Sequence, residues 1–461
     1  MARKDLGDYS CALALWFSWR NSSAMFCRAS ICCFVRPSVE MQGVSQTPGS
    51  RHAFRFFPIF SQALTPFPKS PIIYHIDGTV YPRKGGKDLK ITRAELTHFR
   101  SYEGCEIVPC EGVNVLLGDN GQGKTNVLEA LYLCCTGRSH RTRQDRELIR
   151  WGADFAAVRV EALRRDGTHH VEIALPALGR RKIKVSGQEI SRSGELMGHV
   201  TGVLFSPEDL RTVKDGPAER RRFVDMALSQ VKPAYYYALQ RYARALKQRN
   251  EALKAIAARP ELMATLDAWD EQLAAAGVGL MAQRRDYIRR LSQTAAAIHR
   301  DIADDKERLE IRYLPSVSAG DDDTAFLDAL FAAREADARR MTTTVGAHRD
   351  DVQILVEGRD VRAYGSQGQQ RTAALSMRLS ELDVMREALG EWPMLMLDDV
   401  MSELDPGRRR GRADGPSPGV RSQAQRHRRR HPPGHRRRPG AVGDPLPAQR
   451  VGGRGCRGLP G

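Results

Sequence analysis

A glycine-rich stretch at residues 118–125 has the residue types and spacing that phosphate binding requires. It reads GDNGQGKT and fits the pattern GxxxxGK[ST] at every fixed position. The glycines let the backbone curl so that N–H groups point at an anion, the lysine can bridge two phosphates of a nucleotide, and the threonine can hold Mg²⁺. The alternative is a glycine-rich turn without a ligand. The motif predicts a nucleotide site formed by Gly118, Asp119, Asn120, Gly121, Gln122, Gly123, Lys124 and Thr125.

Two carboxylates far along the chain are suited to complete this site. The segment PMLMLDD places Asp398 and Asp399 after an apolar run, as at the end of a fully buried parallel strand. Asp398 can hold the Mg²⁺ shell, and Asp399 can polarise an attacking water. We therefore predict Lys124, Asp398 and Asp399 as catalytic residues, with Thr125 and Asp398 on the metal. The alternative is a strand that ends in a solvated acidic turn.

A second phosphate-binding device occurs in YGSQGQQR, where Ser366, Gly368 and Gln369 precede a helix with a leucine-rich apolar face. A single monomer has no obvious need for two such devices. Two monomers facing each other do, because each can offer Ser366 and Gly368 to the γ-phosphate that its partner holds. The pattern predicts a homodimer, and the simpler alternative is an ordinary helix N-cap at Ser366.

These motifs need strands and helices to position them, and the surrounding sequence predicts both. Short apolar strands flank the glycine-rich stretch, a hairpin turns at Asp166-Gly167, and a helical region runs from Pro217 to about Arg312. The helix after the glycine-rich stretch has its predicted buried face at Val127, Leu128, Leu131 and Leu133. We expect an α/β fold with a low-order extension (1–88), a core in two parts (89–215 and 316–407), a helical insertion (216–315) and an Arg/Pro/Gly-rich tail (408–461).

The formal net charge of +17 is concentrated at the two ends of the chain. Residues 1–88 contribute +6 and residues 408–461 contribute +13, which leaves −2 for the predicted core. Cys32-Cys33 and Cys134-Cys135 are adjacent pairs and not CxxC, so neither a zinc site nor a disulfide framework is indicated. No apolar run approaches the roughly 18 residues that cross a membrane. The composition favours a soluble, reduced, cytoplasmic protein without a membrane partner.

The order of these motifs resembles the ABC-type ATPases of the SMC group and, more narrowly, the RecF family of recombination mediators. The RecF-like segments are LTHFRSYEG, GRSHRTRQDRELIRWG, VLFSPEDLRTVKDGPAERRRFVD, LKQRNEALK, GAHRDD and SQGQQR, all within residues 89–407. His98 and Ala347 depart from the family's usual Asn and Pro. The resemblance implies an ABC-type P-loop ATPase core with a mixed or parallel sheet, an antiparallel β region and a helical insertion.

By this resemblance the protein is expected to bind ATP and Mg²⁺, to dimerise with two ATP molecules between the subunits, and to clamp duplex DNA at gaps or single-strand/double-strand junctions. Weak, DNA-dependent ATP hydrolysis would release the DNA. RecO and RecR are the partners implied, in loading the recombinase during replication-gap, recombinational and SOS-linked repair. The resemblance also assigns Ser366 to a signature that acts across the dimer, and Asp405 to a loop that communicates across it.

DNA contact is expected from basic residues on the surface of the core, although a charge run is equally often a solvated face. A core with a net charge of −2 can bind DNA if its cations cluster on one surface. The candidates are Arg138, Arg141, Arg143, Lys182, Lys184, Arg220, Arg221 and Arg222.

The two ends of the chain lie outside the resemblance and leave alternatives open. Nothing in 408–461 resembles the strand that should follow SELD, and its composition is that expected of a GC-rich gene read in the wrong frame. A frameshift near Arg408 is our hypothesis, a genuine disordered basic tail is its alternative, and an open sheet edge is the expected consequence. Residues 1–88 are expected to be an over-called start. The alternatives for the whole chain are a RecF-like protein that does not cycle and another ABC-type ATPase, which the long helical insertion disfavours.

Overall fold

The computed structural model describes residues 29–35, 72–75, 89–110, 112–318 and 323–398. Asp399, Asp405 and the tail at 408–461 lie outside the described residues, and so do the predictions made for them. None of the described helices is long and apolar enough to cross a membrane.

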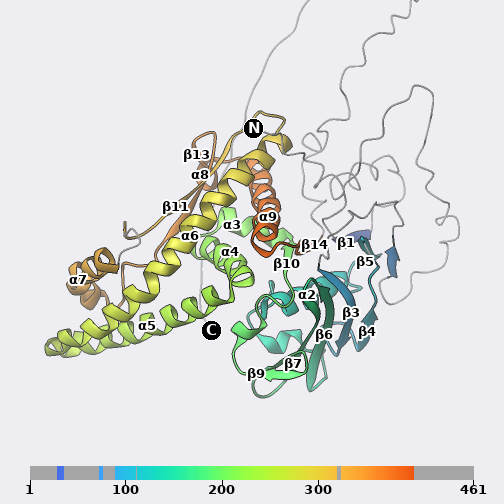
Figure 1. Ribbon diagram of the computed structural model, residues 1–461, viewed down its shortest axis with the longest axis horizontal. Helices are drawn as coiled ribbons and strands as arrows, with labels where there is room; N and C mark the ends of the chain where they lie inside the picture. The colour runs from blue at the N-terminus through green and yellow to red at the C-terminus, as the bar shows by residue number, and fades with distance from the viewer. Residues whose placement is uncertain (1–28, 36–71, 76–88, 111, 319–322, 399–461) are drawn as a thin grey trace, which may run out of the picture. The chain divides into compact units, whose positions relative to one another are not determined.

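An antiparallel sheet of six strands contains the predicted hairpin (Figure 1). Arg164 pairs with Gly167, so the hairpin loop is Arg165-Asp166, one residue before the predicted turn. The strand order is β4-β3-β6-β7-β8-β9. The bounds are β3 (Lys90–Thr97), β4 (Gly104–Ile107), β6 (Phe155–Arg164), β7 (Gly167–Pro176), β8 (Lys182–Val185) and β9 (Gln188–Ile190).

A second sheet brings together the two strands that end in the predicted site. Its order is β10-β14-β1-β5-β2. Strands β10 and β14 are parallel, whereas β1 runs antiparallel to both β14 and β5. Strands β5 and β14 therefore run in the same direction, and their carboxyl ends lie at the same edge of the sheet. The bounds are β1 (Ala29–Val35), β2 (Ile72–His75), β5 (Val113–Asp119), β10 (Gly202–Phe205) and β14 (Met394–Asp398).

Strands β1 and β2 correct two expectations about the ends of the chain. Residues 1–88 were expected to lack regular structure, yet 29–35 and 72–75 are strands of this sheet. The β1 sequence ASICCFV is apolar except for Ser30, and it has no period of two that would reveal a strand. The edge of β14 that was expected to stay open is paired with β1, where Cys32 lies opposite Asp398.

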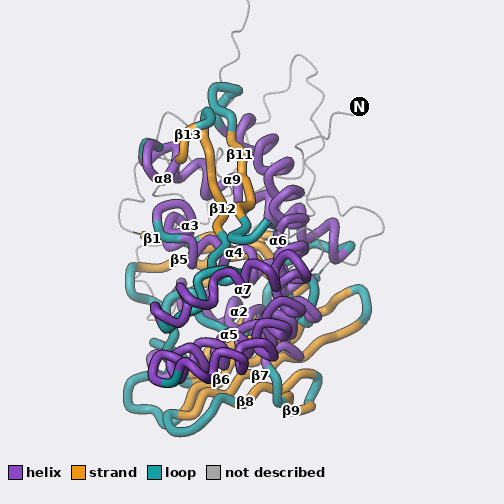
Figure 2. Tube along the Cα trace, turned by 90° about the vertical axis from the view of Figure 1, so that its left-hand side faces the viewer, coloured by secondary structure: helices purple, strands orange, loops and turns teal. Residues whose placement is uncertain are grey.

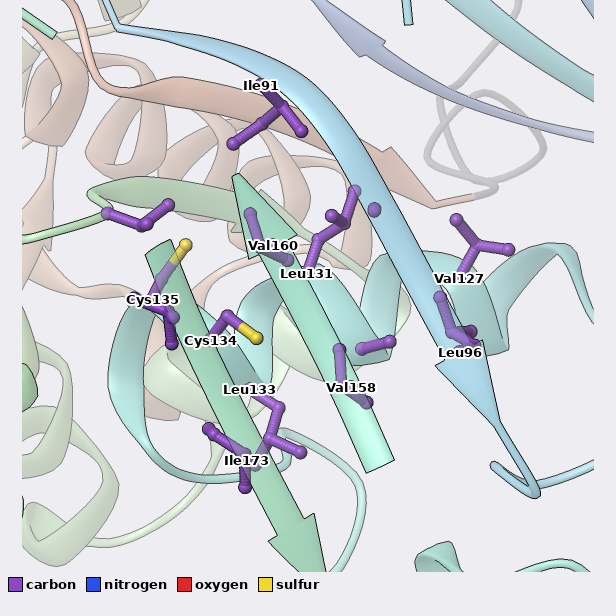
Figure 3. Close-up of a cluster of buried hydrophobic side chains, with 14 of the residues drawn as sticks. Ile91, Leu96, Val127, Leu131, Leu133, Cys134, Cys135, Val158, Val160 and Ile173 are labelled. Atoms are coloured by element: carbon purple, nitrogen blue, oxygen red, sulfur yellow. The ribbon is translucent and has the colours of Figure 1, made fainter. Parts of the chain in front are cut away.

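Helix α2 (Lys124–Thr136) packs between the two sheets and supplies the centre of the main hydrophobic core. All four residues predicted for its buried face are at most 1 % exposed. Cys134 and Cys135 follow Leu131 by three and four residues, so they lie on the same face and are buried as well, whereas Leu133 lies on the opposite side. The helix contacts strands of both sheets. Figure 3 shows α2 meeting β3, β6 and β7 through Ile91, Leu96, Val127, Leu131, Leu133, Cys134, Cys135, Val158, Val160 and Ile173.

A second hydrophobic core lies in the helical region, where the predicted helix ends at Ile302 and not near Arg312. The following segment forms β11, an edge strand that pairs with β12 in a three-stranded sheet of order β11-β12-β13 (Figure 2). The helices are α3 (Leu210–Lys214), α4 (Pro217–Val231), α5 (Pro233–Ala258), α6 (Leu266–Ile302), α7 (Asp323–Arg340), α8 (Val361–Tyr364) and α9 (Gln367–Leu389). The strands are β11 (Leu309–Leu314), β12 (Asp351–Val356) and β13 (Arg359–Asp360). Short 3₁₀ helices are η3 (Asp145–Leu148), η4 (Ser193–Leu196), η5 (Pro207–Asp209) and η6 (Pro260–Thr265).

A fully buried arginine joins α5 to α6 and α7. Arg249 Nε donates to Asp270 Oδ1 and its Nη1 donates to Asp337 Oδ2, both at 2.6 Å. The same Nη1 also donates to Thr343 Oγ1 at 2.9 Å. A buried charge is tolerated only when it is paired and hydrogen-bonded, and this arrangement supplies both.

We expect Arg249→Met to lower the free energy of unfolding by about 3 kcal/mol, because buried carboxylates lose their cation. Denaturant unfolding of the full chain measures the change. Lys254→Met is the matched control, since it removes only the exposed ion pair with Glu251, and we expect it to leave the midpoint unchanged. Equal midpoints for both variants and the wild type would show that the buried pair contributes no net stability.

Candidate nucleotide site

The turn between β5 and α2 has the backbone conformation that an anion site needs. Gly121 and Gly123 have φ angles of 86° and 92°, in the left-handed region that glycine adopts without strain. Gly123 is the N-cap of α2, which begins at Lys124. The first N–H groups of a helix have no carbonyl partner within it and carry the positive end of its dipole. The turn at residues 118–125, which we call the phosphate cradle, therefore offers backbone N–H donors and the positive end of the helix dipole to an anion.

The Lys124 ammonium group is buried in this turn. Its Nζ donates to the carbonyl oxygens of Gly118 and Asp119, both at 2.7 Å, and the residue is 5 % exposed. An ammonium carries three donors, so one N–H remains beyond these two bonds. The loop thus holds a positive charge at the point where the backbone donors converge.

Thr125 and Asp398 are in direct contact although the sequence separates them by 273 positions. The Thr125 hydroxyl donates to Asp398 Oδ1 at 2.9 Å. Thr125 lies in the first turn of α2, after β5, and Asp398 is the buried last residue of β14. The contact follows from the topology, because β5 and β14 end at the same edge. Asp399 is the next residue and lies outside the described residues.

A short segment after β3 covers the glycine-rich turn, and the sequence patterns did not identify it. The Tyr102 hydroxyl donates to the Gly123 carbonyl oxygen at 3.2 Å, and Asn126 Nδ2 donates to Ser101 Oγ at 2.9 Å. A Cβ atom placed on Gly123 would lie 2.7 Å from Ser101 Oγ. Gly123 is therefore required both by its φ angle and by this close approach.

A buried carboxylate joins the same segment to the middle of α2. Glu129 accepts hydrogen bonds from Arg100 Nε at 2.9 Å and Arg100 Nη2 at 2.8 Å, and from the Ser139 hydroxyl at 2.5 Å. Burial alone would raise the pKa of Glu129, but the hydrogen bonds from Arg100 and Ser139 outweigh it and hold that pKa below its usual value. Arg141 is a predicted DNA contact, and its Nη1 lies 3.4 Å from Glu129 Oε2, so it also forms an ion pair within this network.

The turn with Ser366, Gly368 and Gln369 forms the N-terminus of α9. Ser366 is the N-cap, and a capping box joins its side chain to Gln369 N while the Gln369 side chain accepts from Ser366 N. Gln369 Nε2 also donates to Glu307 Oε1 at 3.3 Å. The N-cap interpretation of Ser366 is confirmed. Because Ser366 is exposed, the cap remains accessible to another molecule.

The structure places one of the predicted DNA contacts in the run Arg220-Arg221-Arg222 in the interior of the protein. Arg220 is buried, donates to both carboxylate oxygens of Asp351 at 2.8 and 3.0 Å, and donates to the Asp215 carbonyl oxygen. Arg221 donates to the Asp350 carbonyl oxygen at 2.6 Å, and only Arg222 is left with a distant partner in Glu219, 3.9 Å away. Arg220 therefore positions α4 against β12. A run of three arginines in the sequence does not show which of them faces the interior.

The remaining predicted cations lie on the surface. Arg138 and Arg143 flank the loop after α2, and Lys182 and Lys184 alternate with buried residues on β8, so all four side chains are exposed. Between the two arginines lies His140, which the sequence patterns did not identify. Neither ring nitrogen of His140 has a hydrogen-bond partner among the described residues, and burial lowers its pKa although the charges of Glu129, Glu208 and Asp398 oppose the shift.

The fold and this site together define an ABC-type P-loop ATPase of the SMC group. In agreement, residues 90–414 match the family described as the RecF/RecN/SMC N terminal domain. Within that group the chain belongs to the RecF family. It is 43 % identical over 318 residues to the DNA replication and repair protein RecF of Agathobacter rectalis, covering 69 % of this chain and 87 % of that relative. It is 41 % identical over 322 residues to the RecF protein of Geobacillus thermodenitrificans, covering 68 % and 86 %.

Two solved structures of RecF proteins resemble the chain as well. Both are of the recombination mediator protein RecF in the RecFOR pathway, one with ATP and one with ATPrS. Each is 34 % identical to this chain and covers 70 % of it, and the matches span 89 % and 88 % of those proteins with TM-scores of 0.64 and 0.65.

Alanine at Gly123 is expected to destabilise the protein more than alanine at Gly121. Both positions have a positive φ, which costs about 1–2 kcal/mol for a residue with a Cβ atom. At Gly121 the new atom meets nothing within 4 Å, whereas at Gly123 it meets Ser101 and Tyr102. Thermal unfolding without nucleotide should therefore give the lower midpoint for Gly123→Ala, and adding Ser101→Ala should restore part of the loss. Equal losses in the two glycine variants would contradict the close cover by residues 101–102.

Proposed function

We propose that this chain is an ATP-dependent DNA-binding protein of recombinational and replication-gap repair, which dimerises around two ATP molecules and clamps duplex DNA. The hydrogen bond between Thr125 and Asp398 carries this proposal, because it joins the phosphate cradle to an acid from the opposite end of the core. RecF proteins named for DNA replication and repair, and RecF structures with ATP, support it.

ATP and Mg²⁺ fit the residues at this site. Lys124 and the first N–H groups of α2 would hold the phosphates, and Thr125 and Asp398 would be the protein ligands of the metal. Mg²⁺ is usually held by one or two carboxylates together with phosphates and water. Bound Mg²⁺ would neutralise charge on the phosphates.

The second half of the nucleotide site is proposed to come from a partner subunit. The exposed Ser366, at the N-terminus of a helix of 23 residues, would meet the γ-phosphate that the partner holds. By resemblance, Asp399 would activate the water for slow hydrolysis and Asp405 would signal across the dimer. Hydrolysis would then open the dimer and release DNA.

DNA is proposed to contact the exposed cations of the core, namely Arg138, Arg143, Lys182 and Lys184. Phosphate contacts of this kind hold duplex DNA independently of sequence. Gapped DNA or a junction of single and double strands is the proposed substrate, and RecO and RecR are the proposed partners.

A second candidate is a RecF-like protein that binds ATP without completing the cycle. The observation that favours it is that β1, which precedes the glycine-rich turn in the chain, separates β14 from β5. ATP binding that is never followed by turnover, with or without DNA, would select this candidate.

Lys124→Met is expected to abolish the effect of ATP on DNA binding. Coupling between two ligands typically amounts to about 1–3 kcal/mol, so ATP should tighten duplex binding by the wild type about 5- to 150-fold. Fluorescence anisotropy with labelled duplex, with and without ATP and Mg²⁺, measures this ratio. Lys254→Met on α5 is the control and should behave as the wild type. Equal, ATP-independent binding by the wild type and Lys124→Met would refute the mechanism.

Ser366→Asp and Lys124→Met are expected to complement each other in a mixture. Aspartate keeps a capping oxygen at the start of α9, so stability should hold, but its charge would repel a phosphate of the partner's nucleotide. Each variant alone should fail to dimerise with ATP. In a mixed dimer, the Ser366→Asp subunit binds ATP opposite the intact Ser366 of its partner. Sedimentation should therefore show ATP-dependent dimers only in the mixture, and their absence there would argue against action across the dimer.

A further inference from the structure

Three large apolar side chains are exposed at one end of the six-stranded sheet. Trp151 has no buried surface, Leu178 is 90 % exposed and Phe155 is 44 % exposed. A β-turn closed by the hydrogen bond from Ala153 N to the Arg150 carbonyl oxygen places Trp151 at its tip, and Gly152 supplies the positive φ. A fully exposed indole is rare on a soluble protein unless it meets a partner.

The three side chains belong to neighbouring turns. Phe155 pairs with Pro176 at the end of the β6–β7 ladder, and Ala177 N donates to the Asp154 carbonyl oxygen at 2.8 Å. The turn with Trp151 therefore lies beside the loop with Leu178. Phe155 also packs its ring edge-on against His98, 5.4 Å between centroids, which fixes the inner border of this patch.

Four exposed cations belong to the chain segments that form this apolar patch. Arg143, Arg146, Arg180 and Lys182 are exposed, and none of the four forms an ion pair with another described residue. The other local cations are already paired, Arg181 with Asp145 and Arg150 with Glu103. Only Glu147 and Asp154 are exposed acids in the same segments. The chain thus places an exposed aromatic ring inside a field that attracts phosphate.

Hydrogen bonds connect residues beside the patch to α2, the helix that begins in the nucleotide site. Arg181 donates to the carbonyl oxygen of Gly137, the C-cap of α2, whose first turn holds Lys124 and Thr125. Arg100 donates to the Glu147 carbonyl oxygen at 2.7 Å and to Glu129 of α2. A change in the position of α2 would therefore reach the patch through two independent contacts.

From these contacts we infer that the patch binds an unpaired base of DNA: Trp151 stacks on the base beside Leu178, and the arginines hold the flanking phosphates. The inference rests on the proposed DNA-binding function and goes beyond it by naming the feature of the substrate that is read. An indole stacks on any base, so this contact recognises single-stranded character and not sequence. A protein partner is less well matched, because four unpaired cations favour a polyanion.

The test uses the full chain with ATP and three labelled DNA probes. The first is a blunt duplex, the second is the same duplex with a single-stranded tail, and the third carries an abasic tail that keeps the phosphates but lacks bases. Trp151→Ala should weaken binding of the tailed duplex about tenfold, which is about 1.4 kcal/mol, and leave the other two probes unchanged. Trp151→Phe should retain most of the affinity. Phe331→Ala, which removes an aromatic ring 67 % exposed on α7, is the matched control.

Each other outcome overturns the inference in a recognisable way. If Trp151→Ala binds the tailed duplex as tightly as the wild type does, Trp151 does not stack on a base, and the proposed function is unaffected. An equal loss on all three probes means that the patch holds the duplex backbone. A loss of self-association with intact DNA binding means that the patch is a protein interface. Failure of the wild type to bind even the blunt duplex with ATP refutes the proposed function itself.

Discussion

The hydrogen bond between Thr125 and Asp398 is the contact on which the rest of the arrangement depends. It requires two strands from opposite ends of the core to run in the same direction and to end at the same edge. Strand β1 satisfies this requirement by pairing with both, with Ala29 opposite Asp119 and Cys32 opposite Asp398. A shift of one residue in either pairing would turn every side chain of that strand to the other face and separate the cradle from its acid.

Helix α2 converts this local geometry into a connection across the core. Its first turn holds Lys124 and Thr125, its middle carries Glu129, and its C-cap accepts from Arg181. Both sides of the helix are buried between two sheets, so it moves only with its surroundings. Arg100 donates to Glu129 of α2, and the next two residues, Ser101 and Tyr102, contact Gly123 at the start of the same helix. The segment after β3 is therefore held to α2 at two places. A ligand that moved the glycine-rich turn would therefore also pull on the six-stranded sheet, through the bonds of Arg100 and Arg181.

The sequence predicted the parts of the site whose chemistry is local and missed those that depend on the interior. The glycine-rich turn, the hairpin and the N-cap at Ser366 are each encoded within a few residues, and all three occur in the structure. The role of Arg220 was misjudged, because its partner Asp351 lies 131 positions away and no local pattern reveals the pair. Strand β1 was missed because its sequence has no polar alternation, and Glu129 was missed because its partners come from two separate segments, the one after β3 and the loop after α2.

The positive charges of the chain also show that composition does not reveal where a side chain lies in the folded protein. The net charge of +17 comes from the two ends of the chain, whereas the core has −2 and still contains a cluster of unpaired cations. Several arginines of the core already have carboxylate partners: Arg249 and Arg284 are buried against aspartates, and the half-buried Arg378 pairs with Asp209. The number of arginines in the sequence is therefore larger than the number of arginine side chains available to bind a polyanion. What distinguishes Arg143, Arg146 and Arg180 is that none of them forms an ion pair with a described residue and that their segments also carry an exposed indole. These are properties of neighbouring turns that only the folded sheet brings together.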